Sequence, residues 1–70
     1  MDTDSEMFLL AAEELNFTRA AKRAYVTQQC LSAHIKKLED ELGVTLFERV
    51  GKRMVLTATG QALLAQARAM

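Results

Sequence analysis

Residues 16–38 read NFTRAAKRAYVTQQCLSAHIKKL, and this stretch decides the fold. It holds five basic residues (Arg19, Lys22, Arg23, Lys36 and Lys37) and no Asp or Glu. The first fifteen residues hold five carboxylates, although the formal net charge of the 70-residue chain is zero. Because local patches rather than net charge attract a polyanion, the stretch predicts a cationic surface.

The spacing of capping and apolar residues in this stretch predicts two helices joined by a tight turn. Thr18 is the expected N-cap of a short helix over 19–24, and Tyr25–Val26 forms the turn. Thr27 caps a longer helix, which ends where a glycine follows Leu42. A rotation of about 100° per residue places four apolar side chains of the longer helix on one buried stripe: Leu31, Ile35, Leu38 and Leu42.

The flanking segments complete a mainly α fold. A first helix is expected from Asp4 or Ser5 to Leu15, with Leu15 on its apolar face. Residues 48–56 are typical of a β-hairpin with its tip near Gly51-Lys52. Together these elements predict a winged helix-turn-helix with a three-helix core, a short β-hairpin wing and a C-terminal linker helix.

The expected domain boundaries follow from these elements. Residues 1–57 form the winged helix-turn-helix domain, with the helix-turn-helix at about 18–37 and the wing at about 47–56. Residues 58–70 begin a linker and dimerisation helix, which Thr57 caps. Because the last residues continue an apolar helical pattern, we expect the chain to be a fragment of a longer protein.

Composition argues against several classes of protein. The one cysteine, Cys30, cannot form an internal disulfide, and no Cys/His cluster has metal-ligand spacing. The longest apolar run, 7–12, is far shorter than the roughly 20 residues that span a bilayer. No glycine-rich phosphate loop and no nucleophile–base pattern is visible. We therefore expect a cytoplasmic, non-enzymatic protein that needs no cofactor and has no membrane partner.

The exposed face of the longer helix suits direct readout of a DNA duplex. The start of a recognition helix enters the major groove, where the amides of Gln28 and Gln29 can pair with adenine N6 and N7. Thr27 and Ser32 can bond phosphate oxygens near the positive end of the helix dipole. Farther along, Lys36 and Lys37 reach the flanking phosphates. On the hairpin, Lys52 and Arg53 can enter a narrow minor groove of strongly negative potential.

Several short motifs occur in the order and spacing of one known family. They are Phe17-Thr18-Arg19-Ala20-Ala21, Val26-Thr27-Gln28, Leu31-Ser32, Ile35, Leu38-Glu39, Leu42-Gly43, Leu46-Phe47-Glu48-Arg49 and Leu56-Thr57…Gly60. In these motifs the chain resembles the N-terminal DNA-binding domain of LysR-type transcriptional regulators, and the resemblance covers nearly all of it.

The resemblance carries its own implications for sites and partners. It assigns base reading to Gln28, Gln29, Ser32 and Ala33, and wing contacts to Arg49, Lys52 and Arg53. It also implies binding to double-stranded DNA, a homodimer or higher oligomer through the linker helix, and a small-molecule effector bound only by a further domain that this chain lacks. The family often has proline at the position of Gln29 and arginine at the position of Ala33, so its usual site preference does not transfer intact.

The expected DNA-binding set comprises Thr18, Arg19, Thr27, Gln28, Gln29, Ser32, Ala33, His34, Lys36, Lys37, Arg49, Lys52 and Arg53. His34 of this set, and Cys30 nearby on the same helix, have plainer interpretations that are favoured over a sensing role. A plain solvent-facing or hydrogen-bonded histidine is the main alternative for His34, ahead of a pH switch. For Cys30, a small buried hydrophobe is favoured over a redox sensor.

Two further alternatives concern surfaces rather than single residues. The apolar stripe of the fourth helix (Leu63, Leu64, Ala67 and Met70) belongs either to the core or to a dimer seam, and a seam is favoured for its distal part. A winged-helix module that docks on protein without reading DNA is the alternative function. The carboxylate-free basic stretch argues against it, since a protein-docking face is more often apolar.

Overall fold

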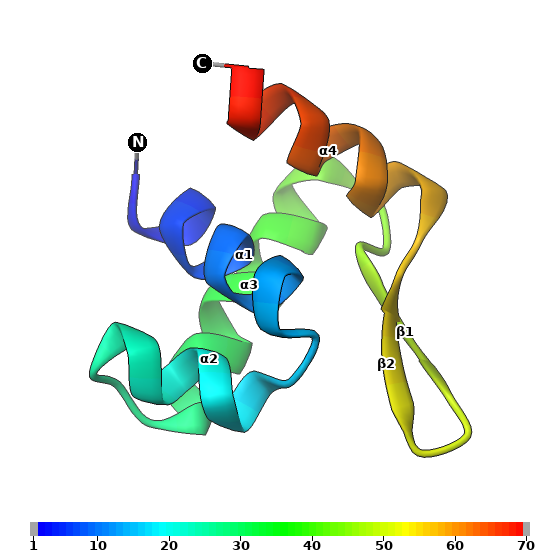
Figure 1. Ribbon diagram of the computed structural model, residues 1–70. Coiled ribbons are helices and arrows are strands. Elements are labelled where there is room, and N and C mark those ends of the chain that lie inside the picture. The colour runs from blue at the N-terminus through cyan, green and yellow to red at the C-terminus, as the bar shows by residue number, and fades with distance from the viewer. Residues whose placement is uncertain (1, 70) are drawn as a thin grey trace.

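The computed structural model describes residues 2–69 and is mainly helical, with one two-stranded antiparallel hairpin (Figure 1). Its elements are α1 (Thr3–Glu14), α2 (Phe17–Ala24), α3 (Gln28–Leu42), β1 (Phe47–Val50), β2 (Arg53–Leu56) and α4 (Ala58–Ala69). Helices α1, α2 and α3 pack on one another, and the hairpin projects away from them at one side (Figure 1). The expected winged helix-turn-helix fold is confirmed.

Side-chain caps fix where each helix begins. Asp2 accepts a hydrogen bond from the Ser5 amide at 2.7 Å, which lowers the pKa of the Asp2 carboxyl. The expected cap Thr27 accepts from the Cys30 amide at 3.0 Å, and Thr57 accepts from the Gly60 amide at 2.9 Å. These bonds satisfy amides that have no partner within the helix.

The predicted cap of α2 is wrong. Asn16 rather than Thr18 caps this helix, because the Asn16 Oδ1 atom accepts from the Arg19 amide at 2.9 Å. The helix therefore begins at Phe17, and Thr18 lies inside its first turn. The hydroxyl of Thr18 is thereby free to reach a side chain of another helix.

Left-handed residues end the first three helices and turn the chain between them. They are Leu15 (φ 49°), Tyr25 (φ 58°) and Gly43 (φ 68°). The expected stop at glycine after α3 is confirmed. Leu15 was expected on the core face, but the left-handed backbone rotates its side chain outward and leaves it 41% exposed.

The core lies where α1, α2 and α3 meet the start of the hairpin. Phe8, Leu31 and Leu46 are its largest fully buried side chains, and Ala20 and Ala21 let α2 approach closely. The Phe47 ring lies 5.7 Å from that of Phe8. On α3, Ile35 is buried and Leu38 packs against the core, as expected. Leu42, however, is 50% exposed, because it forms the last turn of α3 beyond the core.

The root of the hairpin is joined tightly to the start of α4. Thr57 donates its amide to the Leu46 carbonyl at 3.0 Å and its hydroxyl to the Thr45 carbonyl at 2.6 Å. Gly60 is buried, and a Cβ there would overlap the Leu46 carbonyl oxygen and lie 2.9 Å from Leu56 Cδ2. The absence of a side chain at Gly60 therefore sets the position of the hairpin relative to α4.

Candidate nucleic-acid interface

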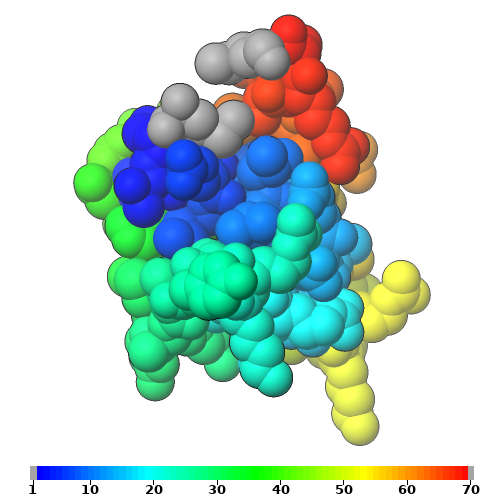
Figure 2. Space-filling model, turned by 60° about the vertical axis from the view of Figure 1, so that its left-hand side comes forward, coloured from blue at the N-terminus to red at the C-terminus, as the bar shows by residue number. Residues whose placement is uncertain are grey.

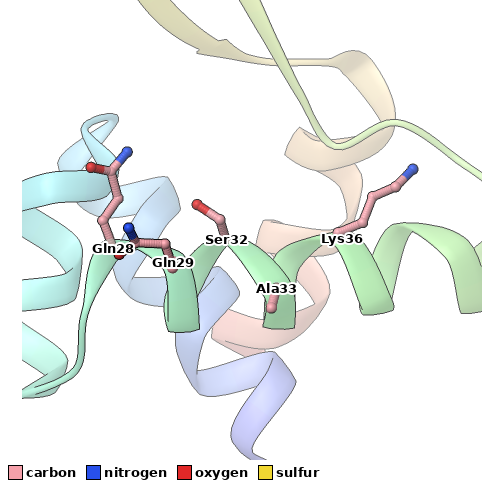
Figure 3. A pocket seen from close by; sticks show the side chains of 5 residues that line it. All are labelled: Gln28, Gln29, Ser32, Ala33 and Lys36. Carbon is pink, nitrogen blue, oxygen red and sulfur yellow. The ribbon is translucent and has the colours of Figure 1, made fainter.

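The exposed face of α3 contains a shallow, open hollow of about 490 Å³ (Figure 3). Long side chains stand at its two ends, whereas short side chains lie in its middle (Figure 3). Its lining residues are Gln28, Gln29, Ser32, Ala33 and Lys36. Four of them are exposed and Ser32 is half-buried. The structure therefore brings the four expected base readers together with one expected phosphate contact.

The amide of Gln28 is tied to the neighbouring helix. Thr18 donates its hydroxyl hydrogen to Gln28 Oε1 at 3.3 Å, which links the first turn of α2 to the first turn of α3. This contact directs the NH₂ group of Gln28 away from Thr18 as a free donor. Sequence reasoning missed it because Thr18 was expected to cap α2.

Basic residues of the hairpin adjoin the same face of α3. Arg49 and Lys52 share a second hollow, of about 200 Å³, with Thr18 and Gln28. Arg49 also lines a third hollow with Ser32 and Lys36. Arg53 is exposed at the start of β2, opposite Val50 in the strand register. Polar and basic groups of α2, α3 and the hairpin thus form one continuous surface.

The two arginines of α2 are held by carboxylates of α1. Arg19 Nε lies 3.1 Å from Glu14 Oε1, and a second nitrogen of its guanidinium group bonds the Glu14 carbonyl. Arg23 Nη1 lies 2.8 Å from Glu13 Oε1 and 3.1 Å from Glu14 Oε2. The hydrogen bond to Glu13 raises the pKa of the Arg23 guanidinium group. Residues 16–38 contain no carboxylate, but in the folded protein carboxylates of α1 therefore lie beside two of their arginines.

The basic residues of α3 lie beside carboxylates as well. His34 Nδ1 lies 2.6 Å from Asp4 Oδ1, and Lys37 Nζ lies 3.5 Å from the other oxygen of Asp4. Lys36 Nζ lies 3.1 Å from Asp40, one turn later on the same helix. His34 and Lys37 are thus drawn toward α1, whereas Lys36 stays at the edge of the hollow.

The remaining features concern the cysteine, metal ligands, membrane-spanning helices and the apolar stripe of α4. Cys30 is a half-buried free thiol. In the range 2–69, no group of His, Cys, Asp and Glu could hold a metal ion. The same residues include no helix long and apolar enough to cross a membrane. Met70 of the predicted apolar stripe lies outside the described residues, whereas Leu63 and Leu64 pack against the core.

A helix-turn-helix whose second helix is exposed, with a basic hairpin beside it, defines the winged helix-turn-helix class. The sequence profile described as "Bacterial regulatory helix-turn-helix protein, lysR family" matches residues 3–61. The chain belongs to this family.

Relatives of known sequence or structure agree with this assignment. The chain is 46% identical to the DNA-binding transcriptional dual regulator OxyR of Escherichia coli (strain K12) over 65 residues, which are 93% of this chain and 21% of the relative. A LysR-family transcriptional regulator from Eggerthella lenta is 40% identical with a TM-score of 0.89, over 100% of this chain and 99% of that one. The DNA-binding domain of BenM, solved with catB site 1 DNA, is 33% identical with a TM-score of 0.91, over 99% and 78%. The chain spans about a fifth of the length of the curated relatives it matches.

Proposed function

We propose that this domain binds double-stranded DNA sequence-specifically as the N-terminal part of a LysR-type transcriptional regulator. One observation carries the proposal: the exposed polar start of α3 adjoins hairpin cations that have no ion-pair partner within residues 2–69. The BenM domain, which shares this fold, is named in its structure as a DNA complex. The protein-docking alternative is not favoured, because this surface is polar and basic rather than apolar.

The proposed roles follow the position of each side chain. The start of α3 enters the major groove, where Gln28, Gln29, Ser32 and Ala33 face base edges. Because a winged domain places its hairpin beside the recognition helix, Lys52 and Arg53 reach the adjacent minor groove. The proposed phosphate contacts, which position the domain without reading bases, are Thr18, Arg19, Thr27, Lys36, Lys37 and Arg49. Of the expected set, His34 has the weakest case, since its ring bonds Asp4.

We propose that α4 joins two copies of the chain. An apolar hollow of about 270 Å³ lies between α4 and the end of α3, lined in part by Leu42, Val44 and Leu63. Leu42 is exposed there, and a second copy of α4 would cover it. Sedimentation at micromolar concentration tests this point: a dimer is expected, and a monomer would contradict it for this chain.

The rest of the proposal concerns the whole protein. The relatives are transcriptional regulators, and we infer that this protein is likewise not an enzyme and works in the cytoplasm on DNA. A small-molecule effector, as in the expectation from the sequence, would bind a separate domain.

The salt dependence of DNA affinity tests the proposed function. Two subunits that neutralise about four phosphates each should give a log–log slope of about −7 against salt concentration. The experiment titrates a duplex selected from a random library and repeats the titration at several salt concentrations. An affinity that does not change with salt would contradict DNA binding and favour the protein-docking module.

A further inference from the structure

The hollow on α3 exists because of the order of side-chain lengths along the helix. Gln28 and Gln29 are long, Ser32 and Ala33 are short, and Lys36 is long again. Positions 28, 32 and 36 are four residues apart, as are positions 29 and 33, so the two neighbouring rows lie on one side of the helix. In Figure 3, Ser32 and Ala33 lie between the extended side chains of Gln28 and Lys36. A group that protrudes from a base edge can therefore reach the helix surface at this point.

The chemistry of the hollow is uneven along its length. Among the described residues, Lys36 is the only charged one in its lining, and the first two turns of α3 present amides, a hydroxyl and a methyl group there. Arg and Lys are the commonest readers of guanine, whereas Gln pairs with adenine N6 and N7. An exposed alanine side chain offers only an apolar surface, which suits the thymine 5-methyl group. The middle of the hollow thus fits A·T pairs.

The two glutamines are not equivalent. Gln28 Oε1 already accepts a hydrogen bond from Thr18. The amide of Gln29 makes no hydrogen bond within the described residues, and both its donor and its acceptor are available for bidentate pairing. Gln29 and Ala33 lie one turn apart, about 6 Å along the helix. This spacing corresponds to about two base-pair steps.

We propose that Ala33 reads a thymine through its 5-methyl group and that Gln29 reads the adenine of a nearby A·T pair. The inference rests on the proposed DNA binding and adds which base pairs the hollow selects. The methyl of Ala33 packs on the methyl of thymine, while the Gln29 amide donates to adenine N7 and accepts from adenine N6. Selection at these positions is against G·C pairs, because cytosine lacks the 5-methyl group and guanine presents the O6 acceptor where adenine presents its N6 donor.

Replacing single thymines by deoxyuridine tests the role of Ala33. The substitution removes only the 5-methyl group from the selected duplex. At one position in each half-site we expect the wild-type protein to lose about fourfold in affinity, the value of burying one methyl group. Ala33→Gly should bind the thymine and uracil duplexes equally. Ala65→Gly, at an exposed position of α4, is the matched control for the helix-weakening effect of glycine and should keep the fourfold difference.

A second variant and a second base analogue complete the test. Ala33→Ser keeps better helix propensity than glycine and should also reduce the thymine preference. For Gln29, replacing adenine by 7-deazaadenine at one position should reduce the duplex affinity of the wild-type protein about tenfold. The same replacement should leave the affinity of Gln29→Ala unchanged. Equal binding of thymine and uracil duplexes by the wild-type protein would overturn the role of Ala33, while salt-dependent binding would still support the proposed function. Failure to bind any duplex would overturn the proposed function itself.

Discussion

The basic residues of the helices and those of the hairpin differ in what surrounds them. Within residues 2–69, Arg19, Arg23, Lys36 and Lys37 each lie within 4 Å of a carboxylate. Arg49, Lys52 and Arg53 have no such partner in the same range, and the side chains of the hairpin tip extend beyond the body of the protein (Figure 2). Lys22 is the one basic residue of α2 that resembles the hairpin in this respect. A block of basic residues in the sequence therefore does not by itself give a surface of unpaired charge in the folded protein.

The difference decides how much each cation can contribute to binding a phosphate. An unpaired cation releases a counterion from DNA and loses nothing else. A cation in an ion pair must give up or share its carboxylate, and the carboxylate repels the phosphate as well. Exposed ion pairs are weak, so the exchange is possible, but the gain is smaller. We therefore expect the hairpin to contribute more affinity per cation than α2 or the end of α3.

The largest expected effect comes from Gly60→Ala, which disturbs the root of the hairpin. A Cβ at this position meets the backbone of Leu46, so the hairpin and α4 must separate. We expect a loss of about 3 kcal/mol in the free energy of unfolding, measured by urea denaturation. The control is Gly43→Ala, where a Cβ has open space and only the left-handed backbone is strained. This control should lose about 1 kcal/mol in the free energy of unfolding. Equal losses would mean that the hairpin is not held by this contact.

The second prediction compares the two sets of cations directly. The double variant Lys52→Ala/Arg53→Ala should weaken duplex binding about 100-fold and reduce the salt slope of a dimer by about 3 to 4. The matched double variant Lys36→Ala/Lys37→Ala removes as many charges, but from residues that are already paired. It should lose distinctly less affinity in the same titration. A larger loss of affinity for Lys36→Ala/Lys37→Ala would contradict the expectation that the hairpin cations contribute more.

The third prediction removes a carboxylate that pairs with cations of α2. Glu14→Gln removes the carboxylate that Arg19 and Arg23 share, which releases Arg19 from its ion pair and leaves Arg23 paired with Glu13 alone. We expect duplex affinity to rise about threefold at low salt. Glu6→Gln makes the same change in net charge at an exposed position of α1 and should raise affinity less. If both variants behaved alike, only the total charge would matter.

The smallest effect is expected for Asp40→Asn. This change frees Lys36 from an exposed pair between neighbouring helix turns, which is among the weakest kinds of ion pair. Affinity should rise by less than about twofold without a change in preferred sequence, as measured by competition between duplexes. A changed preference would mean that Lys36 reads a base instead of a phosphate.

Local signals in the sequence were sufficient for most of the fold. Thr27 and Thr57 cap their helices as expected, Gly43 ends α3, and the hairpin forms where predicted. These features depend on a few neighbouring residues each. Asn16 and Thr18 are both good capping residues two positions apart, and the sequence alone did not distinguish them.

Contacts between helices were beyond local reasoning. The pairs between Glu13 or Glu14 and the two arginines of α2 depend on the corner at Leu15–Asn16, whose left-handed turn brings the end of α1 beside α2. Recognising that corner could have predicted them. The exposure of Leu42 depends likewise on where the core ends along α3, which helical periodicity does not specify. The hollow formed by Ser32 and Ala33 follows from the sequence once the face of α3 is known.

The most direct test of the account is a titration of the isotope-labelled domain with a selected duplex, followed by NMR amide shifts. The account predicts the largest changes at Gln28, Gln29 and Ser32, with further changes at Lys52 and Arg53, and little change at Ala65 on α4. The largest changes at the apolar hollow around Leu42 and Leu63, with the start of α3 unaffected, would contradict it.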